Sequence, residues 1–202
     1  MAKVQTVRGA IDSSQLGTTL MHEHVFVLDT EILQNYPEEW GSEEQRVADA
    51  ITRLNELKAK GVDTIVDLTV IGLGRYLPRI KQIALQTKIN IIVATGIYTY
   101  HDAPLYFHFR GPGTVLGGPE LIVDMFVRDI NEGIADTGVK AGILKCATDE
   151  PGVTKDVERI RVPPRKHTDK PACRFLRIHM PESAWGWTSR EFFRRKASIS
   201  LA

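Results

Sequence analysis

The chain has 202 residues, with 26 Lys+Arg and 25 Asp+Glu giving a formal net charge of +1, and 43% of its residues are hydrophobic. This length fits one domain or part of a larger one, and the apolar fraction is enough for a sizeable core. The balanced charge gives no overall case for a nucleic-acid or membrane-surface partner, and no run of eighteen apolar residues predicts a transmembrane helix.

The cysteine count and the first residues predict the compartment. Residues 1–5 carry no apolar signal-peptide segment. Cys146 and Cys173 are too few for a disulfide framework, which favours a reducing environment. We therefore expect a cytoplasmic protein.

The first predicted elements are a short hairpin, formed by residues 4–8 and 14–20, and a buried strand over residues 20–28. Beyond residue 41, apolar residues spaced by three and four alternate with continuous apolar runs. In chain order we expect a helix over 43–60, strand 62–70, helix 75–87, strand 89–97, helix 119–134, strand 141–147 and a helix from Thr154. Such alternating units imply an α/β fold with a parallel sheet covered by helices. No G-x-G-x-x-G follows the first strand, which weakens a dinucleotide-binding interpretation.

The charge pattern breaks near residue 160. Residues 160–202 carry ten Lys+Arg and three Asp+Glu, a net of +7, so the rest carries 26 − 10 = 16 basic and 25 − 3 = 22 acidic residues, a net of −6. Trp185, Trp187, Phe192 and Phe193 lie among these charges without helical or strand period. We expect residues 1–160 to form one unit and 161–202 to be a basic, aperiodic tail. The tail could be an arm for an anionic partner or a segment never selected to fold.

Two histidines one residue apart, His22 and His24, are the first candidate site residues. On a strand, both side chains point to the same face of the sheet. Imidazole is the commonest metal ligand, so the pair indicates a metal site at the end of an interior strand. The alternative is two histidines packed in a core or exposed at a strand end.

Lys145 is the second candidate, because it lies in the otherwise apolar strand predicted over 141–147. A buried lysine is costly unless it has a partner or loses its charge. A neutral amine can react with carbon dioxide to form a carbamate, whose two oxygens can bridge two cations. The alternative is a lysine that reaches solvent or pairs with Asp67.

These features resemble the phosphotriesterase family of the amidohydrolase superfamily, with the nearest likeness to phosphotriesterase-like lactonases and phosphotriesterase homology proteins. The resemblance covers about residues 3–160. It is carried by His22-x-His24, by Gly96-Ile97-Tyr98-Thr99-Tyr100, and by Lys145 ahead of Asp149-Glu150-Pro151-Gly152.

The resemblance implies a TIM-type (β/α)₈ barrel, of which this chain has only the first four βα units. It also implies two bound divalent metal ions, with Zn²⁺ as the first choice and Co²⁺, Mn²⁺ or Fe²⁺ as the other candidates. In the family, the roles of metal ligands fall on His22, His24 and Lys145, with Lys145 carbamylated by carbon dioxide to bridge both metals. The role of the tyrosine beside substrate and hydroxide falls on Tyr98, so Lys145 and Tyr98 are the expected catalytic residues. The implied reaction is hydrolysis of acyl-homoserine or other lactones, with an organophosphate side activity, by a homodimeric enzyme without nucleic-acid or membrane partners.

The chain also departs from the family pattern. The family supplies further ligands from later strands, namely a histidine each from strands five and six and an aspartate from strand eight, whereas Pro163-Pro164 break the fourth helix here. His167 and His179 are the only later histidines, and neither has a convincing strand-end context. We expect a frameshift or truncation, and an impaired enzyme. The alternatives are a non-catalytic product and an anion-binding protein that uses the basic tail.

Overall fold

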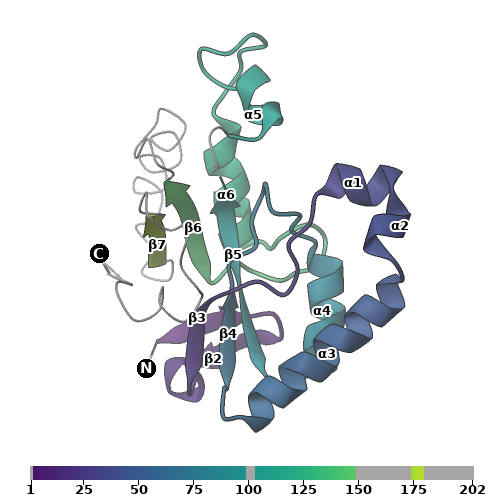
Figure 1. Ribbon diagram of the computed structural model, residues 1–202. Coiled ribbons are helices and arrows are strands. Elements are labelled where there is room, and N and C mark those ends of the chain that lie inside the picture. The colour runs from purple at the N-terminus through teal and green to yellow at the C-terminus, as the bar shows by residue number, and fades with distance from the viewer. Residues whose placement is uncertain (1, 99–102, 149–173, 180–202) are drawn as a thin grey trace.

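The computed structural model describes residues 2–98, 103–148 and 174–179. Its centre is a sheet in the order β3-β4-β5-β6-β7, in which all neighbouring strands are parallel. Figure 1 shows these strands side by side. Their bounds are β3 Thr19–Glu23, β4 Thr64–Asp67, β5 Asn90–Ile97, β6 Ile143–Thr148 and β7 Arg174–His179. The expected α/β fold is confirmed, as a partial (β/α)₈ barrel.

Three longer helices connect the strands, as the apolar spacing predicts. They are α3 Glu43–Ala59, α4 Leu77–Leu85 and α6 Leu121–Asn131. The side chain of Ser42 caps α3 by accepting from Gln45 N at 3.3 Å. Three short helices that the sequence did not predict lie toward the end of the sheet to which the strands point (Figure 1), namely α1 Thr30–Asn35, α2 Pro37–Trp40 and α5 Leu105–Phe109. Across the described ranges, no helix is both long and apolar enough to span a membrane.

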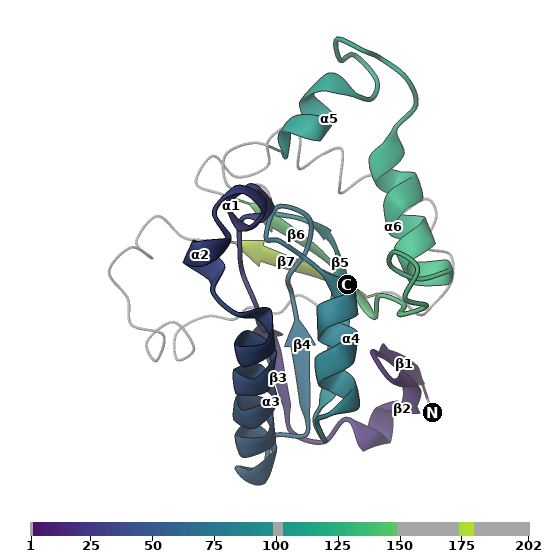
Figure 2. The same cartoon turned by 90° about the vertical axis from the view of Figure 1, so that its right-hand side faces the viewer.

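The two faces of the sheet bury different clusters. Ile65, Ile91 and Val93 pack with α3 and α4, which lie along one face (Figures 1 and 2). Leu68 and Ile143 belong to a separate cluster with Val66, Ile92 and Ala94, which forms the opposite face. Alternation along each strand therefore assigns every residue to the helix-covered face or to the inner face.

The N-terminal strands differ from the prediction. The hairpin pairs β1 Lys3–Thr6 with β2 Gly9–Asp12, while Ser13–Gln15 form a 3₁₀ turn (η1) capped by Asp12. Residues 14–20 are therefore not its second strand. The strand predicted over 20–28 ends at Glu23, after an irregularity in its register with β4. Regular pairing is lost there, and Val27 is 55% exposed.

A strand within residues 161–202 was also not predicted. All six residues of β7 pair in register with β6, from Ile143↔Arg174 to Thr148↔His179. No periodicity in these six residues predicts a strand, but the unpaired edge of β6 offers backbone partners to any extended segment that reaches it. The helix expected from Thr154 and the remainder of the tail lie outside the described residues, and the domain boundary near residue 160 remains a prediction.

Gly96 sets the spacing between β5 and β6. Its φ is +136°, and a Cβ built there would lie 1.8 Å from the backbone oxygen of Lys145. No side chain fits without separating the two strands, whose register pairs Gly96 with Lys145. Glycine is therefore required both by the backbone angle and by the contact.

Gly96→Ala is expected to destabilise the fold, because it adds a backbone clash to the strain of a positive φ. Gly9→Ala is the matched control, since Gly9 has φ +112° but nothing within 4 Å of an added Cβ. We expect Gly96→Ala to lower the free energy of unfolding by about 2 kcal/mol or more beyond the control, measured by urea denaturation. Equal losses in the two variants would contradict the close approach.

Candidate metal centre

His22 and His24 bring two imidazole nitrogens to one point. His22 lies within β3, and His24 is the first residue after it. Their Nε2 atoms are 3.3 Å apart, and the rings meet edge to face at 65°. Two nitrogens bound to one tetrahedral zinc at about 2.0–2.1 Å would be separated by about 3.3–3.4 Å. The histidine spacing therefore fits a shared metal ion, even though the strand ends at Glu23, five residues earlier than predicted.

Both imidazoles are held in the neutral form that metal binding requires. Burial lowers the pKa of His22 to about 4, and the charge of Lys145 contributes to the same shift. Burial likewise lowers the pKa of His24 to about 4, with further contributions from Lys145 and His22. A neutral imidazole keeps a lone pair for a cation.

Lys145 lies inside the fold on the inner face of the sheet. Its side chain is 2% exposed, and Nζ donates to the carbonyl oxygen of Leu68 at 3.0 Å. Nζ also lies 5.4 Å from the ring centroid of Tyr98. Burial lowers its pKa to about 8, against an opposing effect of Asp67. A larger neutral fraction of this amine makes carbamate formation chemically accessible near neutral pH.

The register separates Lys145 from Asp67, the partner considered from the sequence. Asp67 pairs with Val93 on the helix-covered face, whereas Lys145 pairs with Gly96 on the inner face. Asp67 instead accepts from the backbone N–H and the hydroxyl of Thr69, at 3.0 and 2.6 Å. Burial raises the pKa of Asp67 to about 6, opposed by the hydrogen bonds from Thr69 and Val25.

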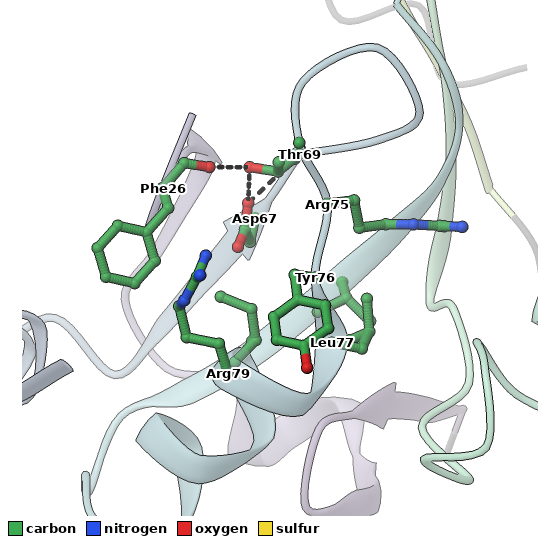
Figure 3. Close-up of a pocket in the computed structure, with 10 residues that line it drawn as sticks. Phe26, Asp67, Thr69, Arg75, Tyr76, Leu77 and Arg79 are labelled. Atoms are coloured by element: carbon green, nitrogen blue, oxygen red, sulfur yellow. Dashed lines mark hydrogen bonds between the residues drawn. The ribbon is translucent and has the colours of Figure 1, made fainter. Parts of the chain in front are cut away.

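Thr69 links this carboxyl group to the histidines, and sequence reasoning missed it. Its hydroxyl lies 2.9 Å from Nδ1 of His24. Figure 3 shows the Thr69 side chain between the Phe26 carbonyl and Asp67, at the edge of a small pocket that Arg75, Tyr76 and Arg79 also line. The signal in the sequence was Asp67-x-Thr69, two polar residues inside an apolar run.

The remaining histidines do not add to this pair in the described structure. His108 lies in α5, where Nε2 contacts Ala103 O at 2.8 Å, away from the pair. His179 is the last residue of β7, so the judgement that it has no strand-end context is wrong. Its register partner is Thr148, which places the position on the face opposite Lys145. His101 and His167 lie outside the described residues.

The donor set fits a divalent metal in part. Among the residues that the structure describes, no group of three or more His, Cys, Asp or Glu side chains gathers at one point. The two neutral imidazoles lie close together, and the charge of Lys145 contributes to the pKa shifts of both. A carbamate on Lys145 would add oxygen donors to these nitrogens. The described side chains therefore offer two imidazole nitrogens whose spacing fits one metal ion.

Comparison with known proteins gives a consistent result. The family model described as the phosphotriesterase family matches residues 2–184, further along the chain than the resemblance over 3–160. A phosphotriesterase homology protein of Mycobacterium tuberculosis is 69% identical over 160 residues, which are 79% of this chain and 49% of that protein. An aryldialkylphosphatase of Saccharolobus solfataricus is 40% identical over 153 residues, 76% of this chain and 46% of that protein.

Solved structures agree with the sequence matches. The structure of the phosphotriesterase from Mycobacterium tuberculosis superposes with a TM-score of 0.82 at 62% identity, covering 88% of this chain and 55% of that one. The chain thus spans about half the length of the relatives that it matches.

The metal-free protein should lose stability in acid through the two histidines. Their folded pKa of about 4 lies below the ordinary histidine pKa of 6.5, so the unfolded chain binds more protons between these limits. The free energy of unfolding therefore falls as the pH drops from 6.5 to 4. Asp67 acts in the opposite direction, because its raised pKa makes the folded state retain a proton between pH 3.8 and about 6.

The measurement is urea unfolding after chelator treatment, at pH steps from 7 to 4, for the wild type and for His22→Gln plus His24→Gln. The double variant keeps polar side chains that do not titrate, so its stability should fall less over this interval. Parallel pH profiles for the two proteins would show that the imidazoles are not buried in the neutral form.

Proposed function

Because the chain belongs to the phosphotriesterase family, we propose that it carries one side of the metal centre of a hydrolase that opens lactones, with a phosphotriesterase side activity. The observation that carries this proposal is the 3.3 Å separation of the two Nε2 atoms beside the buried Lys145. Imidazole ligands suit zinc and iron, and cobalt and manganese are the other metals that the family resemblance implies.

In the proposed site, His22 and His24 would hold one divalent ion through Nε2. The neutral amine of Lys145 would attack carbon dioxide, forming a C–N bond and releasing a proton, and the carbamate oxygens would be further donors for the metal site. When bound, the metal pair supplies hydroxide near neutral pH and polarises the substrate carbonyl or phosphoryl oxygen. Tyr98, whose ring lies beside Lys145, donates a hydrogen bond to the substrate oxygen.

The aromatic segment after β5 supports an apolar substrate. Tyr106 and Phe109 in α5 are 52% and 44% exposed, while Phe107 is buried and anchors the helix in the core. An acyl chain could lie along such a surface at the end of the sheet to which the strands point. We propose a small-molecule lactone or organophosphate substrate for the complete barrel, in a homodimeric, cytoplasmic enzyme.

We propose the hydrolytic activity for a complete barrel and not for this chain alone, because the chain covers only about half the length of its relatives. The described residues supply two histidines and one lysine toward a site that, by the family resemblance, also needs ligands from later strands. The 202-residue chain alone is therefore expected to turn over lactones poorly or not at all.

The catalytic role can be tested in a chimera that joins residues 1–148 to the second half of the Mycobacterium tuberculosis relative. With added zinc or cobalt, we expect hydrolysis of an acyl-homoserine or δ-lactone. His22→Ala plus His24→Ala should lower kcat/KM by at least about 100-fold, because changes merely around a metal ligand already cost 10–100-fold.

The matched control is His108→Ala, which removes a histidine of α5 and should leave the rate within a few-fold. Turnover that survives the double substitution would refute the assignment of the two ligands. A folded, metal-loaded chimera without lactone or phosphotriester hydrolysis would refute the proposed reaction.

Carbamate formation can be tested separately from turnover. After incubation of the chain with ¹³C-bicarbonate and zinc, we expect one carbamate carbon resonance that disappears in Lys145→Arg. The reason is that arginine keeps a positive charge but has no neutral amine near pH 8. Lys140→Arg, a change of a lysine ahead of β6, is the control and should retain the signal.

A further inference from the structure

The hydroxyl of Thr69 contacts three groups from three different positions of the chain. It lies 2.6 Å from Asp67 Oδ1, 3.2 Å from the Phe26 carbonyl oxygen and 2.9 Å from His24 Nδ1. Asp67 and Thr69 are 2% and 7% exposed, so solvent does not compete for these bonds. Figure 3 shows the contacts to Asp67 and Phe26 as dashed lines.

Counting protons fixes the direction of these bonds. The hydroxyl has one proton, while the Phe26 carbonyl and an ionised Asp67 can only accept. The shorter contact to Asp67 takes that proton, because hydrogen bonds to a charged acceptor are the shorter and stronger ones. The hydroxyl oxygen is then left to accept, so Nδ1 of His24 must be the donor.

The state of Asp67 supports this direction. Its Oδ1 also accepts from the backbone N–H of Thr69 at 3.0 Å, and the Val25 backbone donates to the same carboxyl group. These hydrogen bonds favour the ionised, accepting form against the burial that raises the pKa of Asp67 to about 6, so the group is mainly a carboxylate at neutral pH. The Asp67 carboxylate can therefore accept the hydroxyl proton of Thr69, which leaves the hydroxyl oxygen as an acceptor for His24.

We propose that Thr69, oriented by Asp67, is a positioning residue that holds His24 in the tautomer protonated at Nδ1. The Nε2 lone pair of His24 then faces Nε2 of His22, ready for a cation. This inference rests on the proposed function for its metal-binding consequence, but the tautomer itself is a property of the metal-free chain. Partners of the second ring nitrogen commonly set the orientation and affinity of a metal-binding histidine.

A second Thr–Asp pair in the same fold provides a matched control. The hydroxyl of Thr95 donates to Asp129 Oδ2 at 2.6 Å, and Arg75 Nη1 completes that cluster at 2.9 Å. Thr95 is buried, with 0% exposure against 7% for Thr69. Thr95→Val therefore removes an equivalent buried hydroxyl whose cluster is completed by a guanidinium group instead of an imidazole.

The experiment uses the full 202-residue chain. Long-range ¹H–¹⁵N NMR correlations on histidine-labelled, metal-free protein report the tautomer of His24, and competition with a chromophoric chelator reports zinc affinity. We expect the Nδ1–H tautomer in the wild type, in Thr69→Ser and in Thr95→Val. In Thr69→Val the tautomers should mix, and zinc affinity should fall about 10–100-fold, while Thr69→Ser and Thr95→Val stay within a few-fold of the wild type.

Asp67→Ala gives an independent outcome. Without its carboxylate acceptor, the Thr69 hydroxyl can turn its proton to His24, so the Nε2–H tautomer should increase although Thr69 is still present. A wild-type His24 already in the Nε2–H tautomer, or folded Thr69→Val and Asp67→Ala proteins with unchanged tautomers, would overturn the inference. If zinc does not bind to His22 and His24 in the wild type, the proposed function fails, while the NMR result still decides the role of Thr69.

Discussion

The arrangement of the site depends on the burial of one ammonium group. Lys145 lies in the interior because the other residues of its strand are largely apolar. Its ammonium group donates a hydrogen bond to the Leu68 carbonyl and lies near the Tyr98 ring, and both contacts offset part of the cost of burying the charge. Burial lowers the pKa of Lys145 and is also the main reason that the pKa values of both histidines fall, and the charge of Lys145 adds to the histidine shifts. The same burial gives the amine the neutral fraction that a carbamate would need.

The sheet separates the two kinds of group that such a centre uses. Alternation places Lys145 on the inner face and Asp67 on the helix-covered face, although the charge of each still affects the pKa of the other. Thr69 follows where β4 has ended and connects the two sides, with its hydroxyl between Asp67 and His24. His22 lies within β3 and His24 directly follows it, and their Nε2 atoms are 3.3 Å apart.

Much of this was predictable from periodicity. The long helices and the strands over residues 62–70, 89–97 and 141–147 appear within a few residues of their expected bounds, because each has a clear apolar spacing. The early end of β3 was not predictable, since Val25 to Val27 are good strand formers whose fate depends on tertiary contacts. Thr69 could be found only after the register showed which face each polar residue occupies. The pairing of β7 was missed because its partner is a backbone edge, which leaves no signature in local sequence.

The central claim is that His22 and His24 bind one metal ion together, and X-ray absorption at the zinc edge of the zinc-loaded chain tests it most directly. The account predicts two imidazole nitrogens at about 2.0–2.1 Å, with the outer-shell scattering of imidazole rings. It also predicts that this scattering is lost in His22→Ala plus His24→Ala. A zinc spectrum without imidazole scattering, or one that is the same in the double variant, would contradict it.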